Sequence, residues 1–127
     1  MGNIETGKRG EQIAVDHLTR QGFRILARNV RFSGGEIDIV IQDPWDPWDP
    51  NEPERRDVAI VEVKTRSSTR FGAGMDAITP AKYARLRRLA AQWLHENPGH
   101  AGARIDVISI LLGARGHEIE HLIGVLP

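Results

Sequence analysis

Alternating apolar and polar residues in the segment 36–42 (EIDIVIQ) predict a β-strand. Isoleucine occupies every second position, and successive side chains of a strand point to opposite faces. We therefore expect Glu36, Asp38 and Val40 to share one face of this strand. The two carboxylates would then lie on the same side of a sheet.

The segment 57–65 (DVAIVEVKT) has the same period and predicts a second strand. Glu62 and Lys64 lie on one face of this strand and follow Val58 and Ile60 on the same face. The intervening stretch 43–56 has four prolines and a repeated Asp-Pro-Trp unit, which removes backbone donors and predicts a loop. We therefore expect 36–42 and 57–65 to pair as a long hairpin with a Pro/Trp-rich tip.

Two other segments carry apolar residues at helical spacing. The segment 8–21 predicts a helix that Gly22 closes as a C-terminal cap. The segment 80–96 predicts a second helix, with Thr79 as its N-cap and Pro80 at its first position. The apolar stripes of the two helices are Ile13, Ala14, Val15 and Leu18 in the first, and Tyr83, Leu86, Ala90, Trp93 and Leu94 in the second.

Three further segments, 23–30, 104–112 and 118–126, are rich in aliphatic residues and predict strands. The order of elements is then α-β-β-β-α-β-β. This order predicts an α/β fold in which a mixed β-sheet is flanked by helices. A chain of 127 residues is the usual size of one folding unit, so we expect a single domain spanning 1–127.

Charge is distributed unevenly along a chain whose formal net charge is zero. In residues 43–57 six acids stand against two arginines, which leaves 15 basic and 11 acidic residues elsewhere. Between Lys64 and Arg88, seven basic residues are opposed only by Asp76. One interpretation is a basic face that binds nucleic-acid phosphates, and the alternative is an ordinary solvated helix surface.

Cysteine is absent, which excludes disulfides and thiolate metal sites. Any metal ligand must then be a carboxylate, an imidazole or a backbone oxygen. No stretch approaches the roughly 20 apolar residues that cross a bilayer, and the opening residues lack the apolar centre of a signal peptide. We therefore expect a cytoplasmic protein with no membrane segment.

Charged side chains on two otherwise apolar strands indicate a site for chemistry. If the hairpin brings Asp38 within about 4 Å of Glu62, their repulsion at an effective dielectric near 20 is on the order of 4 kcal/mol. A hard divalent cation, Mg²⁺ or Mn²⁺, would relieve it. Lys64 could then orient a water or stabilise charge on a phosphate. Glu11, on the apolar face of the first helix, also needs a partner there. The alternative is an exposed polar face of an antiparallel sheet.

Residues 117–121 (HEIEH) match the zinc-peptidase pattern H-E-x-x-H, which requires two histidines one helical turn apart. Ile119, Ile123 and Val125 favour a strand at this place instead. We interpret the match as chance on an edge strand.

The motifs GEIDIV and VEVKTR resemble the D-x(n)-E-x-K signature of PD-(D/E)XK nucleases, with Glu62 24 residues after Asp38. More closely, GKRGEQIAVDHL, ILARN-x-R and RIDVISI resemble the YraN-like family of small bacterial proteins. Such proteins are similar to archaeal Holliday-junction resolvases. The resemblance implies a restriction-endonuclease-like core and metal-dependent cleavage of DNA, including branched DNA. One departure is Ile37, which stands where the superfamily has the proline of its name.

The resemblance also implies roles for individual residues. Asp38 and Glu62 would hold Mg²⁺ or Mn²⁺, and Lys64 would be the catalytic lysine. Glu11 matches the first-helix acid that assists catalysis in resolvase-like members. Glu36 would stabilise the metal ligands without binding the metal itself.

Four basic residues are expected to contact DNA, namely Arg66, Lys82, Arg85 and Arg88. Resolvase-like enzymes cut two strands as dimers, so the resemblance also implies a homodimer. The loop 43–56, with its tryptophans, is either a docking site for another protein or a variable insertion at a hairpin tip. A non-catalytic module that binds nucleic acid on the same fold is the alternative to the nuclease.

Overall fold

The computed structural model describes residues 2–44, 48–51, 57–67 and 78–127. Within these residues, two helices and five strands follow one another in the predicted order α-β-β-β-α-β-β, which is thereby confirmed. Their bounds are α1 Gly2–Arg20, β1 Arg24–Phe32, β2 Gly35–Gln42, β3 Val58–Arg66, α2 Pro80–Glu96, β4 Ala103–Gly113 and β5 Gly116–Leu122.

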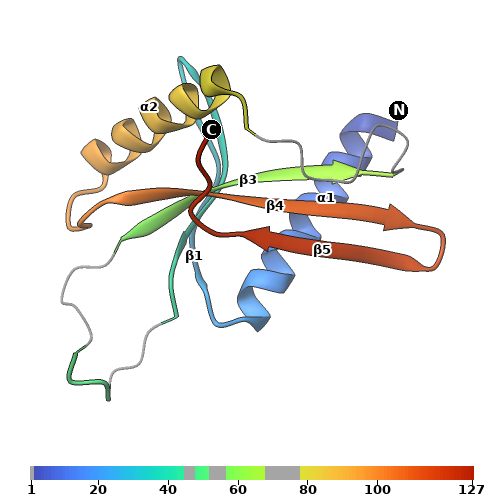
Figure 1. Ribbon diagram of the computed structural model, residues 1–127, viewed down its shortest axis with the longest axis horizontal. Coiled ribbons are helices and arrows are strands. Elements are labelled where there is room, and N and C mark those ends of the chain that lie inside the picture. The colour runs from blue at the N-terminus through green and yellow to red at the C-terminus, as the bar shows by residue number, and fades with distance from the viewer. Residues whose placement is uncertain (1, 45–47, 52–56, 68–77) are drawn as a thin grey trace.

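The five strands form one sheet in the order β1-β2-β3-β4-β5 (Figure 1). β2 pairs antiparallel with β1 and with β3, β3 runs parallel to β4, and β5 returns antiparallel along β4. The sheet is therefore mixed, as the sequence predicted. The antiparallel pairing of β2 with β3 is confirmed, but it extends over four residue pairs and does not form the long hairpin that was expected. The parallel pair requires a crossover, which α2 supplies.

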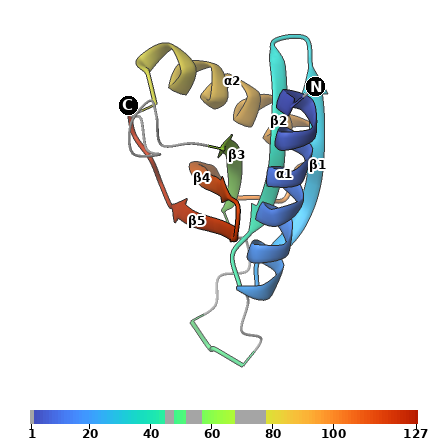
Figure 2. The same ribbon diagram turned by 90° about the vertical axis from the view of Figure 1, so that its right-hand side faces the viewer.

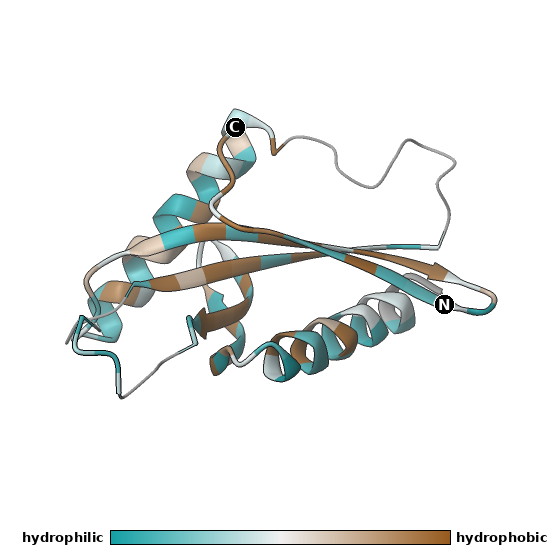
Figure 3. Ribbon diagram, turned by 60° about the horizontal axis from the view of Figure 1, so that its bottom comes forward, coloured by the Kyte–Doolittle hydropathy of each residue, from teal (hydrophilic) through white to brown (hydrophobic). Residues whose placement is uncertain are grey.

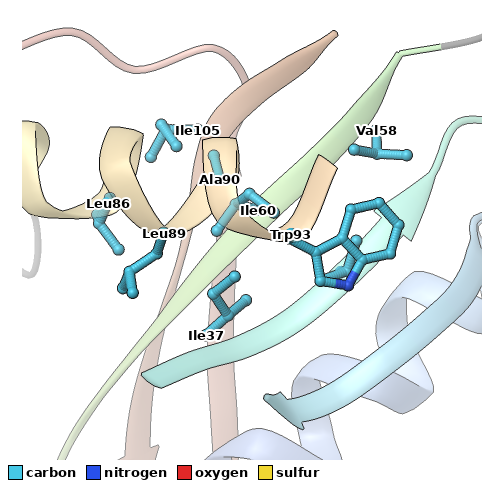
Figure 4. Close-up of a cluster of buried hydrophobic side chains, with 9 residues drawn as sticks. Ile37, Val58, Ile60, Leu86, Leu89, Ala90, Trp93 and Ile105 are labelled. Carbon is cyan, nitrogen blue, oxygen red and sulfur yellow. The ribbon is translucent and has the colours of Figure 1, made fainter. Parts of the chain in front are cut away.

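The two helices cover opposite faces of the sheet (Figure 2). On the α1 face, Ala14 and Leu18 pack against alternate residues of β2, β3 and β4. On the α2 face, Leu86, Leu89 and Trp93 pack against the other set of strand residues (Figure 4). Apolar residues accordingly run along the strands and the inner sides of the helices, while polar residues occupy the outer sides (Figure 3).

Helix α2 begins as predicted. The Thr79 hydroxyl accepts a hydrogen bond from the backbone N–H of Lys82 at 3.1 Å, and Pro80 occupies the first turn. The predicted apolar stripe lacked Leu89, which is 1% exposed and central to the core on this face.

Two predicted boundaries were wrong. Helix α1 begins at Gly2, not at residue 8, and it packs at Gly10 against Thr65 near the end of β3. A Cβ atom at Gly10 would overlap the side chain of Thr65, so the glycine permits this contact. Strand β5 was predicted at 118–126 but ends at Leu122, because the chain turns at Gly124, whose φ is +67°.

The expected loop 43–56 is described only at 43–44 and 48–51, and its other residues lie outside the described part of the chain. Asp43 accepts two hydrogen bonds from the Arg104 guanidinium, at 2.6 and 2.7 Å, which fix the start of the loop to β4. Trp48 is 90% exposed. Among the described helices, none is long and apolar enough to span a membrane.

A buried carboxylate, Asp106 on β4, connects three parts of the chain. Its side chain is fully buried and accepts hydrogen bonds from Arg104, His121 and the backbone N–H of Gly124, all at 2.9–3.2 Å. Burial alone would raise the pKa of Asp106, but these hydrogen bonds outweigh burial and hold the pKa below its ordinary value. Asp106 thus ties β5 and the C-terminal segment to β4.

We predict that Asp106→Asn lowers the free energy of unfolding by about 3 kcal/mol at pH 7, because one partner of a buried charge pair is removed. A carboxylate with a depressed pKa stabilises the fold above its unfolded pKa of about 4, and this contribution is lost as pH falls. The difference from wild type in urea unfolding should therefore shrink below pH 4. Glu118→Gln, on the exposed side of β5, is the control and should change stability by less than about 0.5 kcal/mol.

Candidate active site

Strands β2 and β3 pair over a short distance and then diverge. Their ladder has four residue pairs, from Gln42 with Val58 to Ile39 with Val61. Beyond it, β3 stays paired with β4 as far as Arg66. The sheet therefore opens into a fork, with the hairpin of β1 and β2 on one side and β3, β4 and β5 on the other (Figure 1).

Asp38 lies at the base of this fork, one residue beyond the last pair on β2. Its Oδ2 atom accepts a hydrogen bond from the backbone N–H of Val63 on β3, at 2.9 Å. The aspartate side chain thus bridges the two diverging strands at a position where β2 no longer forms a ladder pair with β3.

The electrostatic surroundings of Asp38 disfavour its charged form. Burial, and after it the negative charge of Glu62, raises the pKa of the Asp38 carboxyl to about 6. The hydrogen bond from Val63 acts in the opposite direction but is outweighed, and Glu11 and Glu36 add smaller repulsions. Asp38 is therefore a carboxyl group that a nearby cation would stabilise strongly.

A cavity of about 510 Å³ opens beside Asp38 on the α1 face. It brings together three of the predicted site residues, Glu11, Glu36 and Asp38. The full lining is Thr6, Gly7, Lys8, Glu11, Asn29, Glu36, Asp38, Val63 and Thr65.

Glu11 has the partner on the apolar face of α1 that the sequence required. Its Oε1 atom accepts a hydrogen bond from the side-chain amide of Asn29 at 2.8 Å and from the Arg28 guanidinium at 3.2 and 3.3 Å. Both partners are on β1. Glu11 is thus fixed at the edge of the cavity by one cation and one amide.

Glu62 lies on the other face of β3, where its carboxylate forms an ion pair with the Lys82 ammonium of α2 at 3.1 Å. The face assignment agrees with the predicted alternation, since Val58 and Ile60 pack on the α2 side and Val61 on the α1 side. Lys64 follows Glu62 by two residues and belongs to the same face of the strand.

The other basic residues predicted to contact DNA lie on β3 and α2. Arg85 and Arg88 are exposed on α2, and Arg66 is the last residue of β3. Lys82, by contrast, is engaged by Glu62.

The donor set of the fork fits a hard divalent cation. Within the described residues, no group of three or more histidine, aspartate or glutamate side chains is close enough to enclose a metal ion. Mg²⁺ and Mn²⁺ do not require one, because they keep several waters and commonly use one or two carboxylates together with substrate phosphate. Asp38 and Glu62 are two carboxylates of the fork, and the charge of Glu62 contributes to the raised pKa of Asp38.

Residues 10–110 match the sequence profile described as "Uncharacterised protein family UPF0102". The chain belongs to this family. The UPF0102 protein of Mycolicibacterium vanbaalenii is 46% identical over 123 residues, which cover 95% of this chain and 93% of that protein. The UPF0102 protein of Pelobacter propionicus is 44% identical over 123 residues, 95% and 81% of the two chains. These matches confirm the YraN-like family resemblance.

Some functional candidates of this UPF0102 chain were missed in its sequence. Arg28 and Asn29 contact Glu11, yet a strand prediction assigns consecutive residues to opposite faces and so separates them. The histidines of HEIEH lie on strand β5, as interpreted, and His121 hydrogen-bonds Asp106. The zinc-peptidase arrangement, which needs a helix, is therefore absent at this place.

We predict that Asp38→Asn raises the free energy of unfolding of this UPF0102 chain at pH 8 by about 1–2 kcal/mol. This figure is smaller than the pKa shift alone would give, because Asp38 is partly exposed to solvent. A carboxyl whose folded pKa is raised to about 6 destabilises the fold above that pH and has no such effect below its unfolded pKa of about 4. The asparagine oxygen can still accept the hydrogen bond from Val63.

Urea unfolding at pH 8 and pH 4 measures this difference, which should vanish at pH 4. Asp16→Asn, on the exposed side of α1, is the matched control and should show no such pH dependence. A variant of Asp38 that is no more stable than wild type at pH 8 would contradict the raised pKa.

Proposed function

We propose that this chain is a Mg²⁺- or Mn²⁺-dependent endonuclease of the PD-(D/E)XK type, with a restriction-endonuclease-like core, that hydrolyses phosphodiester bonds in DNA. The observation that carries the proposal is the fork between β2 and β3, which has Asp38 on one arm and the Glu62-x-Lys64 pair on the other. Two carboxylates and one lysine at diverging strands supply the groups that metal-dependent phosphodiester hydrolysis requires.

Each residue has a definite task in this proposal. Asp38 and Glu62 hold the metal, which when bound lowers the pKa of water and neutralises charge on the phosphate. Lys64 stabilises negative charge that develops on the phosphate oxygens. Glu11 and Glu36 line the same cavity as Asp38 and position water there. One water is consumed for each P–O bond broken, and the products are a phosphate monoester and an alcohol.

The basic residues around the fork support DNA as the substrate. Arg66 on β3 and the exposed Arg85 and Arg88 on α2 carry positive charge on the two elements that hold Lys64 and Lys82. Phosphate contacts of this kind position the backbone without reading sequence. Branched DNA is the first substrate class to test, and cleavage of two strands at a junction would require a homodimer.

A non-catalytic nucleic-acid-binding module is the second candidate, and one observation favours it. Glu62 and Glu11 already have cationic partners within the chain, Lys82 and Arg28. Carboxylates that are neutralised in this way need no metal for stability. The two candidates differ in whether phosphodiester bonds are broken.

We predict that the protein cuts a panel of linear, flap and four-way-junction DNA in the presence of Mn²⁺ or Mg²⁺, and that cleavage stops with EDTA. Asp38→Ala and Lys64→Ala should each reduce the cleavage rate at least about 100-fold, because each removes a group that acts in the transition state.

Two exposed residues outside the predicted site provide matched controls for charge loss. Asp16→Ala, on α1, and Arg115→Ala, in the turn between β4 and β5, should cleave at the wild-type rate. DNA binding without cleavage under all conditions would refute the nuclease and support the binding module.

We further predict that Arg88→Ala weakens DNA binding equally for all sequences. Neutralising one phosphate contact reduces the slope of log K against log salt by about 1. Fluorescence anisotropy between low and moderate salt measures the slope, with Arg115→Ala as control. An unchanged slope for Arg88→Ala, and likewise for Arg85→Ala, would remove this face of α2 from the DNA interface.

A further inference from the structure

Asn29 on β1 has an unusual backbone conformation for a strand residue. Its φ angle is +52°. Among the described residues, all others with a positive φ are glycines. L-amino acids avoid this region because Cβ approaches the carbonyl oxygen, and asparagine tolerates it better than most residues do. A conformation of this kind needs a reason within the surrounding structure.

The backbone of Asn29 breaks the alternation of β1. Arg28 and Asn29 are consecutive, yet both side chains reach Glu11 on the α1 face. The next residue, Val30, packs in the cluster on the α2 face. Two successive side chains therefore point to one face, which a regular strand does not allow.

Strand β2 breaks its alternation directly opposite. Ile37 packs in the cluster on the α2 face, whereas Ile39 packs in the cluster on the α1 face. Asp38 between them opens into the cavity that Glu11 and Asn29 also line. Asp38 and Ile39 thus both point to the α1 face.

The two irregular positions face each other. β1 and β2 pair at Arg28 with Ile39 and at Val30 with Ile37, and Asn29 and Asp38 lie between these pairs. The sequence had predicted Asp38 and Val40 on one face, and this was wrong, because Val40 packs on the α2 side. A local distortion of this type re-aims a side chain next to the bend.

We propose that Asn29 is a positioning residue for Asp38: its left-handed backbone turns the hairpin so that the Asp38 carboxylate faces the cavity and Val63, while its amide fixes Glu11. The significance for catalysis rests on the proposed nuclease function. The geometric part, that Asn29 determines where the Asp38 side chain lies, stands independently of that function.

Two substitutions separate backbone from side chain at this position. Asn29→Gly removes the amide but keeps access to positive φ. Asn29→Val keeps a side chain, but a β-branched residue strongly disfavours positive φ. If the backbone conformation directs Asp38, Asn29→Gly preserves the site and Asn29→Val disrupts it. Circular dichroism verifies folding, and Asn29→Ala replaces the valine variant if that variant is unfolded.

The amide of Val63 reports the position of Asp38 without any metal or DNA, since Asp38 accepts its hydrogen bond. Hydrogen exchange followed by NMR should show Val63 protection lowered about tenfold or more in Asn29→Val, as in the reference variant Asp38→Ala. Asn29→Gly should stay within about threefold of wild type. Val61, in the paired part of the same strand, serves as the internal reference. Unchanged Val63 protection in a folded Asn29→Val or Asn29→Ala protein overturns the proposal.

Mn²⁺ titration by calorimetry and the cleavage rate then test the consequence for the site. Asn29→Val should lower Mn²⁺ affinity and the cleavage rate about tenfold or more, and Asn29→Gly should lower them less. If wild type neither binds Mn²⁺ nor cuts DNA, the proposed nuclease fails, yet the Val63 measurement still decides the role of Asn29. If wild type does both and a folded Asn29→Val does so equally well, the positioning role is overturned.

Discussion

The divergence of β2 from β3 creates a demand for hydrogen bonding on which the candidate site depends. The part of β2 that precedes Ile39 does not pair with β3, so the backbone N–H of Val63 has no ladder partner on β2. Leaving a buried donor unsatisfied costs about 1–3 kcal/mol, so a side-chain acceptor is strongly favoured there. Asp38 provides it. The same opening that separates the strands therefore requires an acceptor at its base, and a carboxylate at this place brings negative charge into a partly buried cavity.

Among the residues that the structure describes, two carboxylates near the fork form ion pairs, and Asp38 forms a hydrogen bond to the backbone. Arg28 neutralises Glu11 on the α1 face, and Lys82 neutralises Glu62 on the α2 face. Asp38 has a backbone N–H as its hydrogen-bond partner and a raised pKa, so the largest electrostatic gain from an added cation is at this residue. A binding module could use the same arrangement to hold a phosphate through a bridging ion. In the proposed nuclease, the lysine two residues after Glu62 supplies a group that stabilises charge developing during bond cleavage.

Local sequence patterns predicted the helices and strands. The features that were not predicted depend on contacts between residues distant in the sequence. The order of helices and strands, the antiparallel pairing of β2 with β3, and the cap at Thr79 follow from periodicity and capping chemistry, which act over a few residues. The close packing of α1 on β3 at Gly10 could not be predicted, because it depends on Thr65, which is distant in the sequence. Nor could the reversal of faces at Asp38, since it depends on the backbone of a residue on another strand. A single aspartate in the apolar run of β4 was a visible signal for the buried Asp106 network.

Two independent features converge on the position of one side chain. The distortion at Asn29 turns Asp38 from the β1 side, and the N–H of Val63 holds it from the β3 side. A sheet that needed only stability would keep its alternation and bury an apolar residue at this place, because a regular ladder costs neither a positive φ nor a desolvated carboxylate. Both costs fall on the same residue pair across the hairpin. Backbone strain and a desolvated carboxylate thus occur together at one place, and the surrounding elements stabilise both. A folded chain prearranges a reactive or binding group in this way.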